Sequence, residues 1–289
     1  MKFNPKLLLI LLCILNASSA IAFRVIDDRG MNLSVISPPK RIVSLLPSIT
    51  ETICALNKCD LLVGVDEYSN TPARAKSVPH LGGGLNPNIE MLVSLKPDLV
   101  LMSNNPQLSQ RLERLGINVF VLKTVNYKDI QRALDNFDLI FQNNDGQKLW
   151  QSLESTITKT ALSLPLEAKS LRVYFEVSTG PFAAGPHSFI GETLTRLGVK
   201  NIIPENLGEF PKLNPEFVVK ERPDLIIVSD NHLPDLLKRP GWSHMGAILE
   251  QRICILSKEQ SDIVVRPGPR MGEGAQIIAE CIAAKGLKS

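Results

Sequence analysis

The sequence predicts an α/β protein of two Rossmann-like lobes with parallel-rich sheets, joined by one long α-helix. The first observation behind this prediction is a repeat, because Asn88–Asn104 reads NIEMLVSLKPDLVLMSN and Asn214–Asp230 reads NPEFVVKERPDLIIVSD. Seven of the 17 aligned residues are identical, and most of the others exchange one apolar residue for another. The second is the alternation of strand and helix patterns in each half, and the third is a long helical pattern between the halves.

The first half opens on an apolar strand and continues with a helix. Pro47 to about Leu56 is predicted as helical, with Ser48 as its N-cap and Glu51, three residues later, completing a capping box. Continuous apolar runs are typical of parallel strands buried on both faces. Such runs predict strands at Arg41–Leu46, Leu61–Val65, Asp98–Met102 and Asn118–Leu122. The intervening helices are predicted at Ile89–Leu95 and Leu108–Leu115.

The second half repeats this order. Its first helix echoes the first helix of the other half, since Glu192–Leu197 (ETLTRL) matches Glu51–Leu56 (ETICAL). Strands are predicted at Arg172–Val177, Asn201–Ile203, Leu225–Ser229 and Arg252–Leu256. Helices are predicted at Ile190–Leu197, Glu216–Glu221 and Gly272–Ala284.

Two helical patterns without any strand pattern lie between the halves. Tyr127–Phe141 is the first, and Asn143–Gly146 breaks it. Gln147–Leu164 is the second, and at about 1.5 Å per residue it spans roughly 27 Å. We therefore expect an N-terminal lobe over residues 23–142, a stiff connecting helix within residues 143–165, and a C-terminal lobe over residues 166–289.

Residues 1–22 have the pattern of a secretory signal peptide. Lys2 and Lys6 form a basic region, Leu7–Leu15 is apolar, and Ala20–Ala22 supplies small residues for cleavage. The apolar run is shorter than the ~20 residues needed to span a bilayer, which favours cleavage over the alternative of an uncleaved anchor. Cleavage would lower the formal net charge from +3 to +1. We expect a mature protein outside the cytoplasmic membrane, in the periplasm.

Composition and motifs exclude several classes of function. The chain is 44% hydrophobic and 21% charged, as a soluble globular protein is, and its 5% aromatic content comes without a basic cluster, so nucleic acid is not expected as a partner. No nucleophile elbow, zinc-protease motif, Walker A motif or dinucleotide fingerprint is present, so we expect neither an enzyme nor a bound cofactor. No two of the four histidines have helical ligand spacing, which argues against a metal site; they are His80, His187, His232 and His244.

Four cysteines remain after the signal peptide. Cys54 and Cys59 are close enough to pair if the helix between them ends early, and the sequence leaves their state open. Cys254 and Cys281 are interpreted as buried thiols, because free cysteine is often buried.

One loop before the last helix carries two arginines. Arg266 and Arg270 flank a Pro-Gly-Pro turn, which can present both guanidinium groups rigidly to an anionic ligand. Asp262 lies four residues before Arg266.

The chain resembles one family in several features taken together: the signal peptide, the motif RIVSLLPSITETICAL, the paired N-x-E…P-D-L units, the long central helix and the motif RPGPR. This is the helical-backbone class of periplasmic substrate-binding proteins, which serve ABC importers for cobalamin, haem and ferric siderophores. The resemblance covers about Arg24 to Ala284. It implies the class III periplasmic-binding-protein fold, a monomer, and a ligand held in the cleft between the lobes. A sensor that presents its ligand to a membrane partner stays as the alternative from a different class.

The resemblance also implies that one glutamate on each lobe docks onto arginines of the importer's permease subunits. The matching residues are Glu90 and Glu216, each two residues after the asparagine that opens its repeat. Two acids on two lobes would fix the orientation of the complex and speed encounter.

Cobalamin is the ligand that the resemblance favours, with haem or a ferric siderophore as alternatives. Six residues stand at the positions that hold the ligand in the cobalamin-binding members: Tyr68, Gly84, Phe182, Phe210, Asp262 and Arg266. Gly84 departs from those members, in which a tryptophan can stand at this position. For haem, Tyr68 could supply a phenolate to ferric iron. The family's disulfide is implied to be absent, because Leu197 occupies the position of the partner of Cys281. Trp242 is expected in the core of the second lobe.

Overall fold

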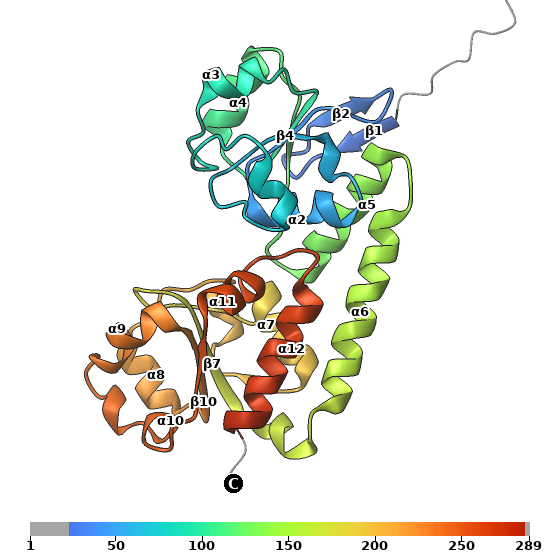
Figure 1. Ribbon diagram of the computed structural model, residues 1–289. Coiled ribbons are helices and arrows are strands. Elements are labelled where there is room, and N and C mark those ends of the chain that lie inside the picture. Colours follow the sequence, from blue (N-terminus) through green and yellow to red (C-terminus); the bar gives the residue numbers. More distant parts are fainter. Residues whose placement is uncertain (1–22, 287–289) are drawn as a thin grey trace, which may run out of the picture.

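A computed structural model describes residues 23–286 of the protein and has two α/β lobes bridged by the long helix α6 (Figure 1). The predicted fold class is confirmed. The predicted signal peptide, residues 1–22, lies outside the described residues. Within residues 23–286, no helix combines the length and the apolar character needed to cross a membrane.

Lobe one is built on a four-stranded sheet in the order β4-β3-β5-β6, in which every neighbouring pair is parallel. Its strands are β3 (Ile42–Ser44), β4 (Leu62–Val65), β5 (Leu99–Met102) and β6 (Val119–Val121). Its helices are α2 (Pro47–Ala55), α3 (Ile89–Ser94), α4 (Pro106–Arg114) and α5 (Tyr127–Phe141). All four strands are close to their predicted positions, because their apolar runs are buried on both faces.

A hairpin that the sequence analysis did not predict precedes this sheet. It consists of β1 (Phe23–Ile26) and β2 (Asn32–Val35), paired antiparallel. The buried carboxylate of Asp27 fastens it to the lobe, because it accepts hydrogen bonds from the N–H groups of Arg29 and Met31 in the turn and of Val121 in β6. The strands are short and mostly exposed, so they lack the apolar run that identified the others.

The start of α2 differs from the prediction. Leu46, not Ser48, is the N-cap residue, and no side chain caps the helix. Pro47 occupies the first turn, where its missing N–H costs nothing and its fixed φ suits a helix. Glu51 does not reach back to the backbone, since its carboxylate is bound by two arginines of the other lobe. The predicted capping box is therefore wrong.

Lobe two has the sheet order β11-β10-β7-β8, with β9 pairing with β7. The sheet is parallel except where β8 runs antiparallel to β7. Its strands are β7 (Arg172–Ser178), β8 (Phe182–Ala183), β9 (Lys200–Asn201), β10 (Leu225–Ser229) and β11 (Ile253–Leu256). Its helices are α7 (Phe189–Leu197), α8 (Pro215–Glu221), α9 (Leu233–Leu237), α10 (Gly246–Leu249), α11 (Lys258–Val264) and α12 (Met271–Cys281).

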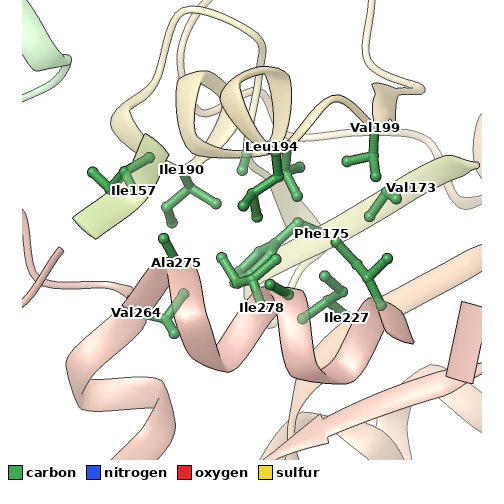
Figure 2. Close-up of a cluster of buried hydrophobic side chains, with 14 of the residues drawn as sticks. Ile157, Val173, Phe175, Ile190, Leu194, Val199, Ile227, Val264, Ala275 and Ile278 are labelled. Carbon is green, nitrogen blue, oxygen red and sulfur yellow. The ribbon is translucent and has the colours of Figure 1, made fainter. Parts of the chain in front are cut away.

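The sheet of lobe two has a buried hydrophobic cluster on each face. On one face, Phe175 of β7 and Ile227 of β10 meet Leu194 of α7 and Ile278 of α12 (Figure 2). On the other face, Trp242 is fully buried against Tyr174, and its indole N–H donates to the Pro215 carbonyl, so its predicted place in the core is confirmed. The two clusters hold α7 and α12 on one side of the sheet and α8 on the other.

The connector α6 (Asp145–Ser163) is the helix predicted at Gln147–Leu164. Its 19 residues correspond to roughly 28 Å. It contacts α5 near its start and α7 and α12 along its length, and it runs down one side of both lobes (Figure 1). The helix therefore rests on both lobes and does not cross open solvent as a free linker.

Both pairs of cysteines form disulfides. Cys54 and Cys59 are joined because α2 ends at Ala55, which is the condition that the sequence left open. Cys254 and Cys281 are also joined, so their interpretation as buried thiols is wrong. Packing of α12 on the sheet places Cys281 beside Cys254 of β11, with 5.9 Å between the two Cα atoms.

We expect the two disulfides to contribute unequally to stability. The Cys254–Cys281 bridge spans 27 residues and the Cys54–Cys59 bridge spans five, so loop-closure entropy predicts losses of roughly 3.5 and 2 kcal/mol when each is removed. Urea denaturation of the two double cysteine-to-alanine variants would measure both losses. A larger loss from the short bridge would contradict this order.

Candidate functional site

A cavity of about 490 Å³ lies between the lobes, at the carboxyl ends of the parallel strands of lobe one. Three segments of lobe one line it, each directly after a strand: Leu46–Ser48 after β3, Ser103–Asn104 after β5, and Leu122–Val125 after β6. Ligands of open α/β sheets bind at this edge, because the loops that follow parallel strands gather there. The volume falls in the range of ordinary small-molecule sites, roughly 300–1,000 Å³.

Lobe two contributes two aromatic rings to the same cavity. Phe189, the first residue of α7, and Phe210 meet edge to face, with 6.2 Å between the ring centroids. The Phe189 N–H donates to the Val125 carbonyl of lobe one at 2.7 Å, which joins the two lobes at the cavity lining. The cavity is therefore lined by two aromatic rings of lobe two and by loops of lobe one that carry both apolar and polar side chains.

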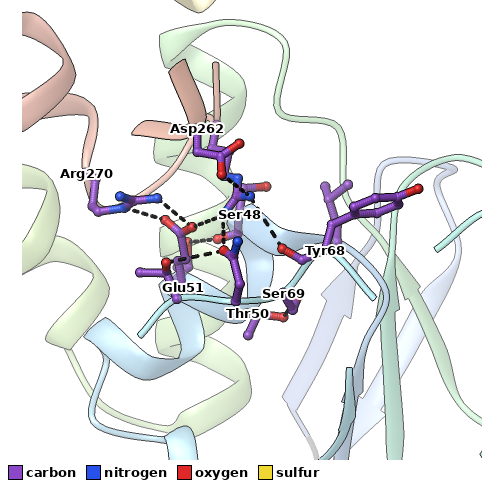
Figure 3. A network of polar contacts seen from close by, with 12 residues as sticks. Ser48, Thr50, Glu51, Tyr68, Ser69, Asp262 and Arg270 are labelled. Carbon is purple, nitrogen blue, oxygen red and sulfur yellow. Dashed lines mark hydrogen bonds and ion pairs between the residues drawn. The ribbon is translucent and has the colours of Figure 1, made fainter. Parts of the chain in front are cut away.

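A buried ion network joins the lobes beside this cavity (Figure 3). The Glu51 carboxylate, on α2, accepts hydrogen bonds at 2.8 Å from Arg266 and from Arg270, both in the loop between α11 and α12. Arg266 is also 3.3 Å from the Asp262 carboxylate. The two guanidinium groups that the sequence analysis expected to face a ligand are thus committed to carboxylates of the protein.

A chain of hydroxyl groups supports the network from lobe one. The Thr50 hydroxyl bonds to the hydroxyls of Ser44 and Ser69, each at 2.8 Å, and the Ser69 hydroxyl donates to Asp66. Burial raises the pKa of the Asp66 carboxyl above its ordinary value, against the opposing effect of the Ser69 hydrogen bond. These contacts hold the loop after β4, whose Tyr68 carbonyl accepts a hydrogen bond from Arg266.

The structure places the six expected ligand residues at different depths. Phe210 and Arg266 line the cavity, and Asp262 lines a neighbouring cavity of about 500 Å³ in lobe two. Tyr68 is 62% exposed and Phe182 is 37% exposed, and neither belongs to the lining of the first cavity. In Figure 3 the ring of Tyr68 points away from the ion network.

Gly84, the sixth, has a physical reason to be glycine. A Cβ at this position would lie 2.1 Å from the carbonyl oxygen of Leu45, well inside van der Waals contact. No aromatic side chain can stand there unless the backbone moves.

Glu90 and Glu216 are exposed and occupy equivalent places in the two lobes. Each is in the first turn of its helix, α3 or α8, where a negative charge is favoured by the helix dipole. The preceding asparagine, Asn88 or Asn214, is the N-cap in both cases, and its side chain accepts a backbone hydrogen bond. Both helices lie on the side of their lobe that is remote from α6 (Figure 1).

Of the cavity lining, only Phe210 and Arg266 were predicted; Ser48 and Phe189 are among the residues that were not, and neither was the role of Glu51 as the bridge between lobes. A signal for Ser48 existed in its position just after an apolar strand. Across residues 23–286, no group of three or more His, Cys, Asp or Glu side chains is arranged to hold a metal ion.

Comparison with known proteins identifies the family. The periplasmic binding protein family model matches residues 42–259, which is most of the chain. The chain belongs to the periplasmic binding protein family. An uncharacterised ABC transporter substrate-binding lipoprotein, YvrC of Bacillus subtilis, is 30% identical over 271 residues, which is 89% of this chain and 84% of that protein.

Two further relatives have names that state a ligand. The vitamin B12-binding protein of Yersinia pestis (strain Pestoides F) is 29% identical over 199 residues, covering 66% of this chain and 69% of that protein. The periplasmic heme-binding protein RhuT of Roseiflexus sp. RS-1, solved in its apo form, is 25% identical with a TM-score of 0.70, covering 87% of this chain and all of that one.

Membership of this periplasmic binding protein family makes the chain a substrate-binding protein of the ABC-transporter type that works outside the cytoplasm. Such proteins bind and deliver and do not catalyse. The interlobe cavity is therefore the candidate site for the transported substrate.

Proposed function

We propose that this protein captures a corrinoid, cobalamin, between its lobes and delivers it to the permease of an ABC importer. The observation that supports this most is the cavity at the junction of the lobes, with the edge-to-face pair Phe189 and Phe210 from lobe two and loops with apolar and polar side chains from lobe one. A large macrocycle needs apolar contact surface together with a few converging hydrogen-bonding groups.

Charge at the cleft favours a corrinoid over haem. The two cationic side chains in the lining, Lys123 and Arg266, both have carboxylate partners, at 3.9 Å from Asp129 and 2.8 Å from Glu51 respectively. Haem propionates would compete with those carboxylates, whereas the neutral amides of a corrinoid would not. The similarity to a vitamin B12-binding protein points the same way.

Tyr68 is a poor candidate for an iron ligand. Coordination to ferric haem requires the phenolate. The hydrogen bond from Tyr68 to the Glu67 carboxylate, together with the negative charge of that carboxylate, raises the pKa of the Tyr68 phenol above its ordinary value. Tyr68 is also 62% exposed and lies outside the lining of the cavity, so it does not face the proposed binding site.

The permease is the proposed protein partner, and the two lobes together form the contact. Glu90 and Glu216 are exposed, and their helices α3 and α8 both lie on the side of the molecule remote from α6, so one membrane partner can meet both (Figure 1). We propose that the protein acts as a monomer.

Isothermal titration calorimetry of the mature chain, from Phe23 onward, tests the ligand. Cyanocobalamin is expected to bind one to one, and hemin and a ferric hydroxamate more weakly or not at all. Binding of hemin alone would replace cobalamin by haem in the proposal. If none of the three probes binds, the assignment to this ligand class is refuted.

Substitution of Phe210 by alanine is expected to weaken cyanocobalamin binding about tenfold, because a ring that packs on the macrocycle contributes roughly 1–1.5 kcal/mol. Leu162→Ala serves as the control, since Leu162 is a strongly exposed residue of α6 outside the cavity lining. Equal affinities of the two variants would show that Phe210 does not contact the ligand.

A further inference from the structure

Ser48 is the one described residue of the cavity lining whose buried hydroxyl oxygen has no hydrogen-bond partner. The residue is 3% exposed, and its Oγ is buried without a donor or acceptor in contact. A buried hydroxyl left unpaired costs free energy, so native proteins pair nearly all of them. An exception that lines a ligand cavity indicates a partner that arrives from outside.

The backbone around Ser48 supplies a second donor. Ser48 is in the first turn of α2, a helix of nine residues, where N–H groups have no intrahelical acceptor. Pro47 has no N–H, and the N–H groups of Ile49 and Thr50 donate to the Leu46 carbonyl. The Ser48 N–H and O–H therefore stand together at the positive end of the helix dipole.

At this end of α2, no side chain of the helix accepts a hydrogen bond from the Ser48 N–H or O–H. The Ser48 carbonyl accepts the Thr52 hydroxyl at 2.7 Å, and the Glu51 carboxylate is taken by Arg266 and Arg270. Gly268 packs against Ser48 from lobe two, where a Cβ would lie 3.2 Å from the Ser48 carbonyl oxygen. Ser48 is thus almost fully enclosed by protein and lines two cavities.

We infer that Ser48, through its hydroxyl and its N–H, holds one peripheral oxygen acceptor of the bound macrocycle. The acceptor is a carbonyl-type oxygen: an amide carbonyl if the ligand is a corrinoid, or a propionate carboxylate if it is haem. This inference rests on the proposed function and deepens it, since it names the group that the cleft recognises and the residue that recognises it.

A bound water is the competing occupant. Ser48 also lines a small inner cavity of about 20 Å³, which is enough for one water molecule. The remaining lining of that cavity is mostly apolar, with Ile130, Leu134 and Phe137 among its residues. Thr52 and Thr124 are its other polar lining residues, and the Thr52 hydroxyl already donates to the Ser48 carbonyl. A water there would have few free polar partners, which favours the ligand as the partner of Ser48.

The first arm of the test measures the melting temperature of the ligand-free protein. Ser48→Ala is expected to melt no lower than the wild type, because it removes no existing hydrogen bond. Ser188→Ala is the matched control, since the Ser188 hydroxyl donates to the Gly185 carbonyl and accepts from the Gly191 N–H; its loss is expected to lower the melting temperature by about 2–4 °C. A fall of that size in Ser48→Ala would overturn the inference.

The second arm measures affinity by calorimetry with cyanocobalamin and with hemin. Ser48→Ala is expected to bind the probe that the wild type prefers about tenfold more weakly, as the loss of one hydrogen bond to a ligand predicts. Unchanged affinity, the result expected if Ser48 holds only a water, would overturn the inference and leave the proposed function intact. If the wild type binds neither probe, the proposed ligand class fails, and the melting temperatures alone decide the inference.

Discussion

Replacing Glu51 by glutamine is expected to lower the free energy of unfolding by about 3–5 kcal/mol. The Glu51 carboxylate is buried, and it neutralises Arg266 and Arg270, whose side chains are only 11% and 21% exposed. Removing its charge takes from Arg270 the carboxylate that pairs with it and leaves Arg266 with the Asp262 carboxylate, in a poorly solvated site, which costs far more than the loss of an exposed ion pair. Urea denaturation of the mature protein would measure the loss.

Glu221→Gln provides the control for this substitution. Glu221 pairs with Arg172 at 2.7 Å, but the two side chains are 31% and 44% exposed, so solvent screens the pair and a loss below about 1 kcal/mol is expected. Similar losses from both variants would mean that the interlobe network contributes no more than a surface pair.

The same network bears on how the lobes move. Besides α6, contacts at two places cross from one lobe to the other within residues 23–286. One is the Glu51 network. The other joins the start of α5 and the residues just before it to α7, where the Phe189 N–H donates to the Val125 carbonyl, the Tyr127 N–H donates to Glu192 at 2.6 Å and the Tyr127 hydroxyl bonds to Thr193. Burial raises the pKa of Tyr127 to about 12, so this hydroxyl stays protonated at physiological pH. Three connections at separate points leave little freedom for a hinge, and we expect closure on binding to be small.

Most of the helices and strands could be predicted because their signals are local. An apolar run that follows a Pro-Asp pair defines β5 and β10, and the repeat that contains both strands reveals that the lobes correspond. The hairpin β1–β2 was not predicted. It is held to the lobe by the hydrogen bond from the Val121 N–H in β6 to Asp27, and these two residues are 94 positions apart in the sequence. Its alternating, half-exposed residues carry too weak a pattern to recognise alone.

The site was harder to predict, since it depends on contacts between segments far apart in the chain. Glu51 and Arg266 are 215 residues apart, and nothing local shows that they pair. From the sequence, Glu51 was predicted to complete a capping box and Arg266 to face an anionic ligand. Both predictions agree with the local sequence, and only the contact between the lobes shows that the two residues pair with each other. The Cys254–Cys281 bridge was missed for the same reason, because only the packing of α12 on β11 brings its ends together.

Reversing the charge of both Glu90 and Glu216 to arginine is expected to abolish transport while leaving ligand affinity unchanged. Both residues are exposed and lie away from the cavity lining, so the substitution leaves the cleft intact. Like charges brought together at an interface cost several kcal/mol, and two such contacts would reduce association with a permease at least 100-fold. Uptake of labelled cyanocobalamin into proteoliposomes containing the cognate importer would measure transport, and calorimetry would measure affinity.

The double substitution Glu167→Arg and Glu280→Arg gives the matched control, because it makes the same change of net charge at two other exposed glutamates. If this control also stops transport, the effect is one of net charge and not of docking. If affinity falls together with transport in the Glu90 and Glu216 variant, the two acids act at the cleft. Each single reversal is expected to keep partial transport, since one lobe still docks, and full loss from one reversal would mean that a single lobe carries the contact.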